Sequence, residues 1–260
     1  MISVPPRPAL TAAALLLLGL TSGPAARAFN YHELEVYPYR TAAKGELELE
    51  NSTAHTLDGA NTPPGANDGL TRTSVEATYG LTSHVEVAAY GDFSHARGGT
   101  GLDFAGQRYR LRARFAEKGQ LPVDVGVYAE LEMPKHDEDT RELELRGILE
   151  KDFGPWTVDL NPLVEKVLKG RNTARGWELG YAAAVIYRMN ERVQPRLEFF
   201  GNLGPIQHFE PHRRQIHLIS PALTYSPSPT FHLLGGVAFG MTDASEQTLL
   251  RLRLEKEFYF

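Results

Sequence analysis

Polar and apolar residues alternate through most of the chain from Lys44 onward. In the segment 108–115, RYRLRARF, four arginines occupy every second position, and tyrosine, leucine, alanine and phenylalanine occupy the others. A period of two places alternate side chains on opposite faces of a β-strand, whereas a helix would scatter both sets around its circumference. The segments 46–50, 123–133 and 142–146 follow the same rule. They predict strands with one polar and one apolar face.

The alternation predicts twelve strands, with boundaries placed to within about two to four residues. Tight turns alternate with longer connections along the chain, and this layout is typical of up-and-down antiparallel barrels in the bacterial outer membrane. The pattern breaks near Ser220 and Pro221, which predicts a bulge there and keeps ten or fourteen strands as alternatives. The expected strands are 44–53, 70–80, 84–93, 102–116, 121–133, 140–153, 155–169, 175–188, 191–203, 212–226, 229–241 and 247–260.

A soluble β-sandwich is the main alternative fold. Its strands are usually nearer five or six residues, whereas most of these run for ten or more with one continuous polar face. Aromatic residues also gather near the strand ends, as expected for two girdles at the membrane surfaces. These aromatics are Tyr79, Phe93, Phe115, Phe153, Trp156, Trp177, Tyr187, Phe199, Tyr225, Phe231 and Phe239.

The first 28 residues have the layout of a secretory signal peptide. An arginine precedes an apolar run over 9–20, and Ala26-Arg27-Ala28 supplies the small residues before a cleavage expected ahead of Phe29. The apolar run is shorter than the roughly 20 residues of a membrane-spanning helix, which disfavours the alternative of an anchor. The expected organisation is a signal peptide over 1–28, a periplasmic or plug-like lead-in over 29–43, and a barrel over 44–260.

Composition narrows the class of protein. The 260 residues include no cysteine, which excludes disulfide scaffolds, zinc ribbons, iron–sulfur sites and catalytic thiols. Lys and Arg number 27 against 32 Asp and Glu, and this acidic balance disfavours a nucleic-acid partner. The mean hydropathy of −0.31 is too polar for a bundle of membrane helices, but it does not exclude a barrel, whose alternating faces average out.

The last eleven residues, LRLRLEKEFYF, resemble the C-terminal strand of Gram-negative outer-membrane β-barrels. That family ends in an aromatic residue, here Phe260, preceded by apolar residues at every second position; Phe258 fits this pattern and Lys256 departs from it. The resemblance implies an outer-membrane location among lipid and lipopolysaccharide, and recognition of Phe258 and Phe260 by the barrel-insertion machinery. The segment 79–87, YGLTSHVEV, is similar to a phrase in the transporter-like barrels of the phenol-degradation MetA type.

If the apolar faces meet lipid, the polar faces line the lumen. The fourth predicted strand neighbours the fifth, and closure makes the last strand the neighbour of the first, so ladders of opposite charge are expected across both junctions. The residues expected to line the lumen and set selectivity are Arg108, Arg110, Arg112, Arg114, Arg251, Arg253, Glu46, Glu48, Glu130, Glu132, Glu142 and Glu144.

Two functions are compatible with such a wall. Twelve strands lie between the eight-stranded barrels filled by side chains and the 16–18-stranded porins with open channels. The functional hypothesis is a porin-like channel for small polar or anionic solutes, in which the arginine row attracts the solute. In the alternative, the charges are salt bridges that hold a structural barrel together without transport.

The sequence offers little for catalysis or metal binding. A lipid-modifying enzyme would need a nucleophile and a base close together near the outer rim, and Ser94-His95, expected in a loop, is a pair without a surrounding motif. His208, Glu210 and His212 are weak metal candidates, as is the acidic segment 136–139, because neither spacing is diagnostic. Phosphate-binding glycine loops and hydrolase motifs are absent, so no enzyme activity and no cofactor is expected.

Overall fold

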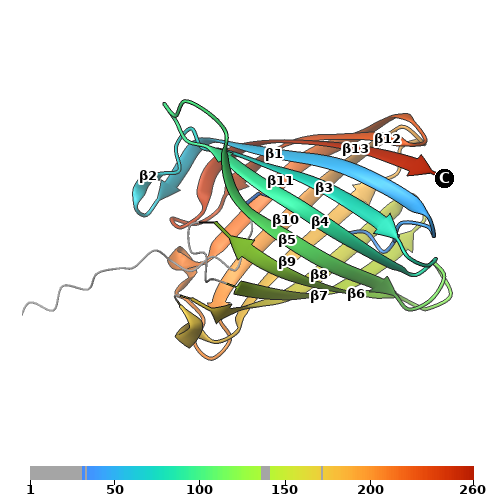
Figure 1. Ribbon diagram of the computed structural model, residues 1–260, viewed down its shortest axis with the longest axis horizontal. Helices are drawn as coiled ribbons and strands as arrows, with labels where there is room; N and C mark the ends of the chain where they lie inside the picture. Colours follow the sequence, from blue (N-terminus) through green and yellow to red (C-terminus); the bar gives the residue numbers. More distant parts are fainter. Residues whose placement is uncertain (1–30, 33, 136–140, 171) are drawn as a thin grey trace, which may run out of the picture.

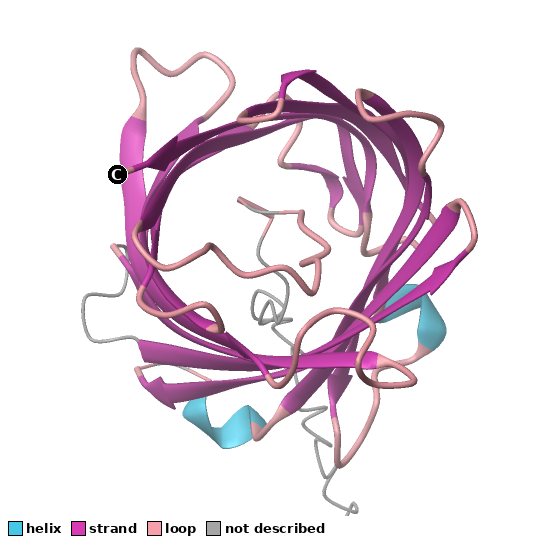
Figure 2. Cartoon of the chain, turned by 90° about the vertical axis from the view of Figure 1, so that its right-hand side faces the viewer, coloured by secondary structure: helices cyan, strands magenta, loops and turns pink. Residues whose placement is uncertain are grey.

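The structure is a computed structural model that describes residues 31–32, 34–135, 141–170 and 172–260, and in it twelve long antiparallel strands close into a barrel (Figures 1 and 2). Each strand pairs with its neighbours along the chain, and β13 pairs with β1 to complete the ring. A three-residue strand, β2 (Pro64–Ala66), adds to the far end of β1. The barrel strands are β1 (Glu46–Asn61), β3 (Thr71–Gly80), β4 (Val85–His95), β5 (Asp103–Arg114), β6 (Asp124–Pro134), β7 (Arg141–Phe153), β8 (Trp156–Lys169), β9 (Glu178–Tyr187), β10 (Val193–Pro205), β11 (Ile216–Ser228), β12 (Phe231–Gly240) and β13 (Glu246–Tyr259).

The twelve-stranded antiparallel barrel predicted from the alternation is confirmed. Two details of the prediction are wrong. β1 continues to Asn61, well past the expected end at residue 53. The bulge expected at Ser220-Pro221 is absent, because the β11–β12 pairs on either side of it keep one register, and the register shift falls between Tyr225 and Ser228. Proline removes a ladder hydrogen bond, and it does so here without inserting a residue.

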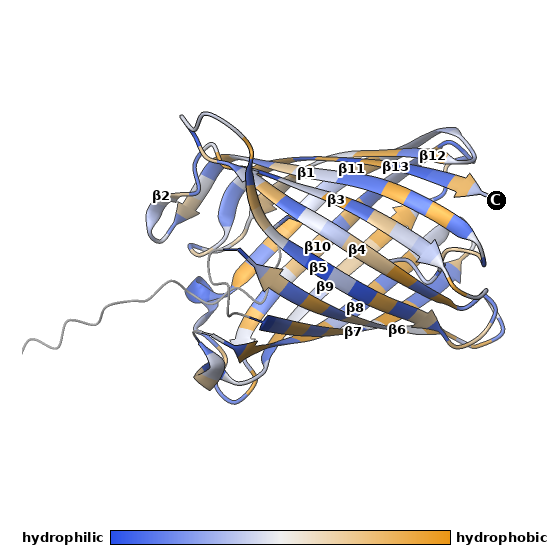
Figure 3. Cartoon of the chain, viewed as in Figure 1, coloured by the Kyte–Doolittle hydropathy of each residue, from blue (hydrophilic) through white to orange (hydrophobic). Residues whose placement is uncertain are grey.

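The two faces of the wall differ as the alternation predicts. On β5, Arg108, Arg110 and Arg112 are buried, while Tyr109 and Leu111 between them are about half exposed on the outside. Along the strands, hydrophilic and hydrophobic residues alternate in Figure 3. The outer surface is therefore apolar and the inner surface of β5 is charged.

The two ends of the barrel are distinct. The end that carries Phe260 has the shorter connections, such as 154–155 and 229–230, and is called the turn end here; the other is called the loop end. Two 3-10 turns, η1 (Thr173–Arg175) and η2 (His212–Arg214), lie in connections of the loop end. No helix among the described residues is long and apolar enough to cross a membrane.

Aromatic side chains mark both ends of the outer surface. At the turn end Trp156 packs against Tyr187 with ring centroids 4.7 Å apart, and at the loop end Phe93 packs edge-on against Phe104 at 5.7 Å. Lys256, the residue that departs from the C-terminal pattern, directs its ammonium to the Thr230 hydroxyl at the turn end (2.6 Å). A long side chain that carries its charge to the end of an apolar wall is the snorkelling geometry.

The chain before β1 runs inside the barrel. Residues 34–45, called the lumen segment here, cross the interior as a loop without regular structure (Figure 2). Val36, Tyr37 and Tyr39 on it are almost fully buried. The segment enters β1 through a tight contact, since a Cβ on Gly80 would lie 1.8 Å from the Ala43 carbonyl oxygen. Glycine at position 80 is therefore what lets this turn pack against β3.

Candidate functional site: the barrel lumen

Tyr37 anchors the middle of the lumen segment. Its backbone N–H donates to the Asn161 side-chain oxygen on β8 (2.7 Å), and the Asn161 amide donates back to the Tyr37 carbonyl (3.1 Å). Its ring packs against Tyr128 with centroids 4.9 Å apart, and its hydroxyl meets the Tyr90 hydroxyl at 3.2 Å. Arg146 lies over the same ring at 4.8 Å. The segment is thus bound to β4, β6, β7 and β8 at one residue.

Carboxylates of the wall accept backbone N–H groups further along the segment. Tyr39 donates its N–H to Glu150 at 2.7 Å, and Ala42 donates to Glu86 at 2.6 Å. The Tyr39 hydroxyl donates to the carbonyl of Ala116 in the β5–β6 connection (2.6 Å). Hydrogen bonds from backbone to ionised acceptors are stronger than neutral ones, so these contacts fix the segment at the turn end.

Arg40 compensates the negative charge of a cluster of carboxylates at the seam where β1 pairs with β13. Its guanidinium contacts Glu46 and Glu48 at 2.6 Å and Glu257 at 3.2 Å. Burial alone would lower the pKa of Arg40, but the carboxylates of Glu48, Glu257 and Glu46 outweigh it and raise the pKa, so the guanidinium stays charged.

The prediction that opposite charges face each other across the β1–β13 junction is wrong. The register sets Glu257 opposite Glu48 and Glu255 opposite Glu50, while Arg253 faces Ser52. Like charges directly opposite one another destabilise a strand pair. The compensating charges come partly from the lumen segment and partly along the diagonal, where Arg253 reaches Glu50 at 3.5 Å.

The arginine row of β5 pairs mainly toward β3 and β4. Its register with β6 does place Arg110 opposite Glu130 and Arg108 opposite Glu132, as expected. The shorter ion pairs, however, run to acids that the sequence analysis did not single out: Arg108 to Asp92 (2.9 Å), Arg110 to Glu76 (2.7 Å) and Glu86 (2.9 Å), and Arg112 to Glu86 (2.8 Å). Alternation on β3 and β4 places these three acids on the same inner face as the arginines.

The other predicted lumen residues lie at the following places. Arg114 lies at the turn end, where it ion-pairs with Glu117 (2.8 Å) and donates to the Ser83 carbonyl. Arg251 contacts Glu198 (2.5 Å) and the carbonyl of Leu34, and Arg253 contacts Glu35 of the lumen segment. Two like-charge pairs lie across β6 and β7, Glu130 opposite Glu144 and Glu132 opposite Glu142. Glu144 also contacts Arg146 at 2.7 Å.

Acidic groups outnumber basic groups on this inner wall. Among the described residues, fifteen Asp and Glu side chains but only five arginines are buried. Part of the opposite wall is apolar: Ala182, Phe200 and Leu249 belong to a buried cluster that also includes Tyr31, Leu34 and Val36. The sequence of β9 is apolar on both faces after Glu178. This was the signal in the sequence for an apolar part of the inner wall, against which the chain before β1 packs.

Several cavities remain beside the lumen segment, and two of them bear on its role. One of about 60 Å³ lies among Glu50, Glu76, Arg110 and Arg253 and has room for a few water molecules. The other, called the vestibule here, measures about 530 Å³ at the turn end and is lined by Tyr39, Lys118, Glu150, Asp159, Ile186 and Arg188, among others. Burial would lower the pKa of Lys118, but its hydrogen bond and ion pair with Glu150 (2.5 Å) raise it.

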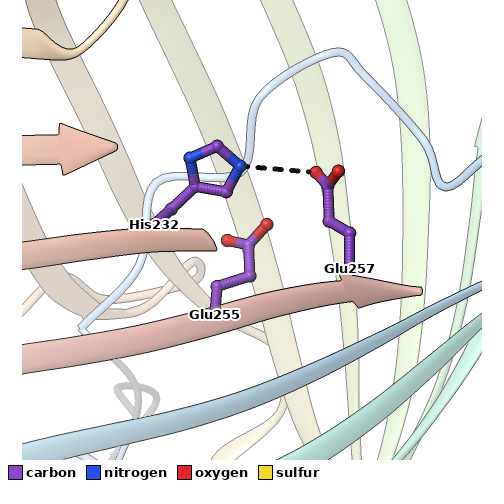
Figure 4. Close-up of side chains that lie close together, drawn as sticks. All are labelled: His232, Glu255 and Glu257. Carbon is purple, nitrogen blue, oxygen red and sulfur yellow. Dashed lines mark ion pairs between the residues drawn. The ribbon is translucent and has the colours of Figure 1, made fainter. Parts of the chain in front are cut away.

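One inner cluster combines imidazole and carboxylates. His232 on β12 points toward Glu255 and Glu257 on β13, with the His232 Nε2 3.6 Å from a Glu257 oxygen (Figure 4). The other ring nitrogen contacts the Ser226 hydroxyl at 2.7 Å. One ligand atom from each residue lies within 4.8 Å of the others, as divalent-cation binding requires, but Glu257 already pairs with Arg40. The contacts present are those of a His–Glu ion pair.

The structure does not bring together the residues that the sequence offered as weak metal-binding and catalytic candidates. His208 and His212 are exposed, and Glu210 pairs with Arg175 (3.5 Å) and Arg214 (3.8 Å); the three do not form a cluster of converging ligand atoms among the described residues. Ser94 and His95 end strand β4 rather than lying in a loop. Consecutive strand residues point to opposite faces, so this pair cannot act as nucleophile and base. Residues 1–28 and 136–139 lie outside the described residues.

No family model matches the sequence, and no curated relative matches it. Solved structures do. An outer membrane channel from Pseudomonas putida F1 is 14% identical, with 86% of this chain and 100% of that chain covered and a TM-score of 0.59. The KdgM porin is 10% identical, with 82% of this chain and 99% of that chain covered and a TM-score of 0.53; its complex with disordered oligogalacturonate gives 11% and the same score. This chain therefore has the fold of outer-membrane β-barrels.

Proposed function

We propose that the protein is an outer-membrane, porin-like channel for small polar solutes, delivered there by a cleaved signal peptide over residues 1–28. In this arrangement the turn end faces the periplasm and the apolar outer surface contacts lipid and, in the outer leaflet, lipopolysaccharide. The solved channels and porins that share the fold support the proposal. The sequence of segment 79–87, which is similar to a phrase in MetA-type barrels, agrees with it. The channel acts without catalysis.

The charged inner wall is the observation that carries this function. Burying unpaired charges costs several kcal/mol each, so a lumen that holds fifteen buried acids and five buried arginines among the described residues needs water or permeating ions around them. Each of Arg108, Arg110 and Arg112 already pairs with acids of β3, β4 or β6, so the arginine row is not available to attract anions. The excess of acids favours cations and neutral polar solutes over anionic ones.

The lumen segment sets the closed state of the channel. The cavity of about 60 Å³ beside it is too small for a solute larger than a few waters, so passage requires the segment to move. Hydrogen bonds and ion pairs with wall residues, which water can replace, hold the centre and the turn end of the segment, while Leu34 and Val36 pack in the apolar cluster. The same obstruction favours the second candidate, a structural barrel that does not conduct.

Single-channel recording of the folded protein in planar bilayers tests the proposal. We expect discrete events from the whole mature chain, larger or more frequent events from a variant that lacks residues 29–43, and a reversal potential in a KCl gradient that indicates cation preference. A folded barrel, identified by fast migration of the unheated sample on SDS gels, that stays silent in both forms would leave the structural barrel as the function. Anion preference would overturn the assigned selectivity.

A further inference from the structure

The vestibule contains a buried carboxylate atom that no protein group satisfies. Asp159, near the start of β8, is 1% exposed, and its Oδ1 atom has no hydrogen-bond partner. The residue directly opposite in the β7–β8 pair is Glu150, another buried carboxylate, which can hydrogen-bond Asp159 only when one of the two carries a proton. Buried polar atoms in folded proteins are normally paired, and an unpaired one marks a place where a donor is missing.

The cations around the vestibule have partners other than Asp159. Lys118 contacts Glu150 and Asp152, and Arg188 contacts Asp152. Arg196 is close enough to act on Asp159 electrostatically, but it makes its ion pair with Glu198 at 2.8 Å. No cation of the wall therefore donates to Asp159 Oδ1, and this atom is open to a donor from outside the chain.

We infer that the vestibule is a binding site for small aliphatic primary amines, with the ammonium group donating to Asp159. The inference rests on the proposed channel function, because the vestibule lies on the path from the lumen to the turn end. The contact of Lys118 with Glu150 at 2.5 Å shows how this site receives an ammonium group. Tyr39 and Ile186 supply an apolar wall for the carbon chain, and about 530 Å³ is ample for a molecule of five or six carbons.

An amine fits these groups better than a neutral or an anionic solute. A neutral hydroxyl would donate one hydrogen bond to Asp159, whereas an ammonium has three N–H donors and brings a positive charge beside the two carboxylates. A carboxylate ligand would be repelled by Asp159 and Glu150 and would have to displace acids that already pair with Lys118 and Arg188. The acid excess of the inner wall also concentrates cations over anions near the site.

Calorimetry on the full mature chain in detergent micelles tests the inference with three five-carbon probes: 1,5-diaminopentane, 1,5-pentanediol and glutarate. We expect binding of the diamine alone. Asp159→Asn keeps the shape of the side chain and removes its charge, so diamine binding should weaken about tenfold or more. The matched control is Glu178→Gln, since Glu178 is a buried carboxylate that also has an oxygen without a partner but lies at the loop end.

Conductance of the same preparations separates this inference from the proposed function. KCl conductance without diamine binding would overturn the vestibule site and keep the channel, as expected if Asp159 and Glu150 share a proton instead. Diamine binding that Asp159→Asn weakens, in a protein that never conducts, would keep the site and overturn the channel. Equal binding of all three probes, or equal loss in both variants, would overturn the assignment of the amine to Asp159.

Discussion

Asn161 makes two hydrogen bonds to a single residue, accepting the Tyr37 N–H at 2.7 Å and donating to the Tyr37 carbonyl at 3.1 Å. One side chain thereby satisfies the backbone of an irregular segment as a neighbouring strand would. Asn161 is fully buried on the inner face of β8, so no water competes for these bonds in the closed barrel. The pair is the central attachment of the lumen segment to the wall.

Loss of this attachment should open the proposed channel more often. Asn161→Ala removes both hydrogen bonds, each worth about 1 kcal/mol, and leaves two backbone groups of Tyr37 unpaired unless the segment leaves the wall. We expect more frequent conductance events and faster trypsin cleavage after Arg40, measured by mass spectrometry of the released peptide. Asn51→Ala, on the outer face of β1, is the control. Unchanged events and cleavage in Asn161→Ala would show that the segment does not gate the barrel.

A buried ion pair clamps the strands on either side of β1. Arg72 on β3 donates to both oxygens of Glu246 on β13, at 3.0 and 2.6 Å, and Thr56 of β1 donates to the same carboxylate at 2.5 Å. Glu246→Leu leaves the Arg72 guanidinium buried without its partner, which costs about 3–5 kcal/mol. We expect a lower urea midpoint, followed by tryptophan fluorescence in micelles. The double variant Arg72→Met/Glu246→Leu should recover most of the loss, and no recovery would contradict an electrostatic cause.

The acids of β6 and β7 should set cation preference. Glu132 and Glu142 lie opposite each other toward the loop end and are half-buried on the inner face. Replacing both with glutamine removes two negative charges from the lumen without a change in side-chain size, so the ratio of cation to anion permeability should fall toward one. Reversal potentials in a KCl gradient measure this ratio. Glu191→Gln is the control: it removes one negative charge from an exposed turn outside the lumen, and we expect the ratio of cation to anion permeability to stay unchanged.

The C-terminal aromatic should matter for assembly more than for the finished barrel. Phe260 is 94% exposed and Phe258 lies on the outer face, so neither holds the fold together by burial. Phe260→Ala should reduce the amount of heat-modifiable barrel in outer-membrane fractions of cells, yet barrel refolded from urea in detergent should keep its stability. Phe239→Ala removes an exposed aromatic at the loop end and serves as the control. Equal loss from both variants would argue against a C-terminal signal.

The strands could be predicted because the alternation of polar and apolar residues that produces them lies within each segment of the sequence. On β5 a polar residue at every second position fixes both the strand and its inner face, and this needs no knowledge of neighbours. The partners of Arg110 were not predictable, because cross-strand register depends on turns and on diagonal reach rather than on strand order. The lumen segment has no period at all: Tyr37 and Tyr39 find their partners on β4 to β8, 50 or more positions along the chain.

The turn from the lumen segment into β1 should depend on glycine at position 80. This residue is buried, and an added Cβ would lie 1.8 Å from the Ala43 carbonyl oxygen, a backbone atom that cannot rotate away. Gly80→Ala must therefore push the segment off β3, at a cost of about 1–3 kcal/mol from overpacking. Gly235→Ala is the matched control, since it adds the same methyl group within strand β12 where nothing lies within 4 Å. We expect a lower urea midpoint and faster cleavage after Arg40 in Gly80→Ala only, because the strain falls on the segment that carries Arg40. If both alanine variants behave like the native chain, the close contact between Gly80 and Ala43 does not hold the segment in place.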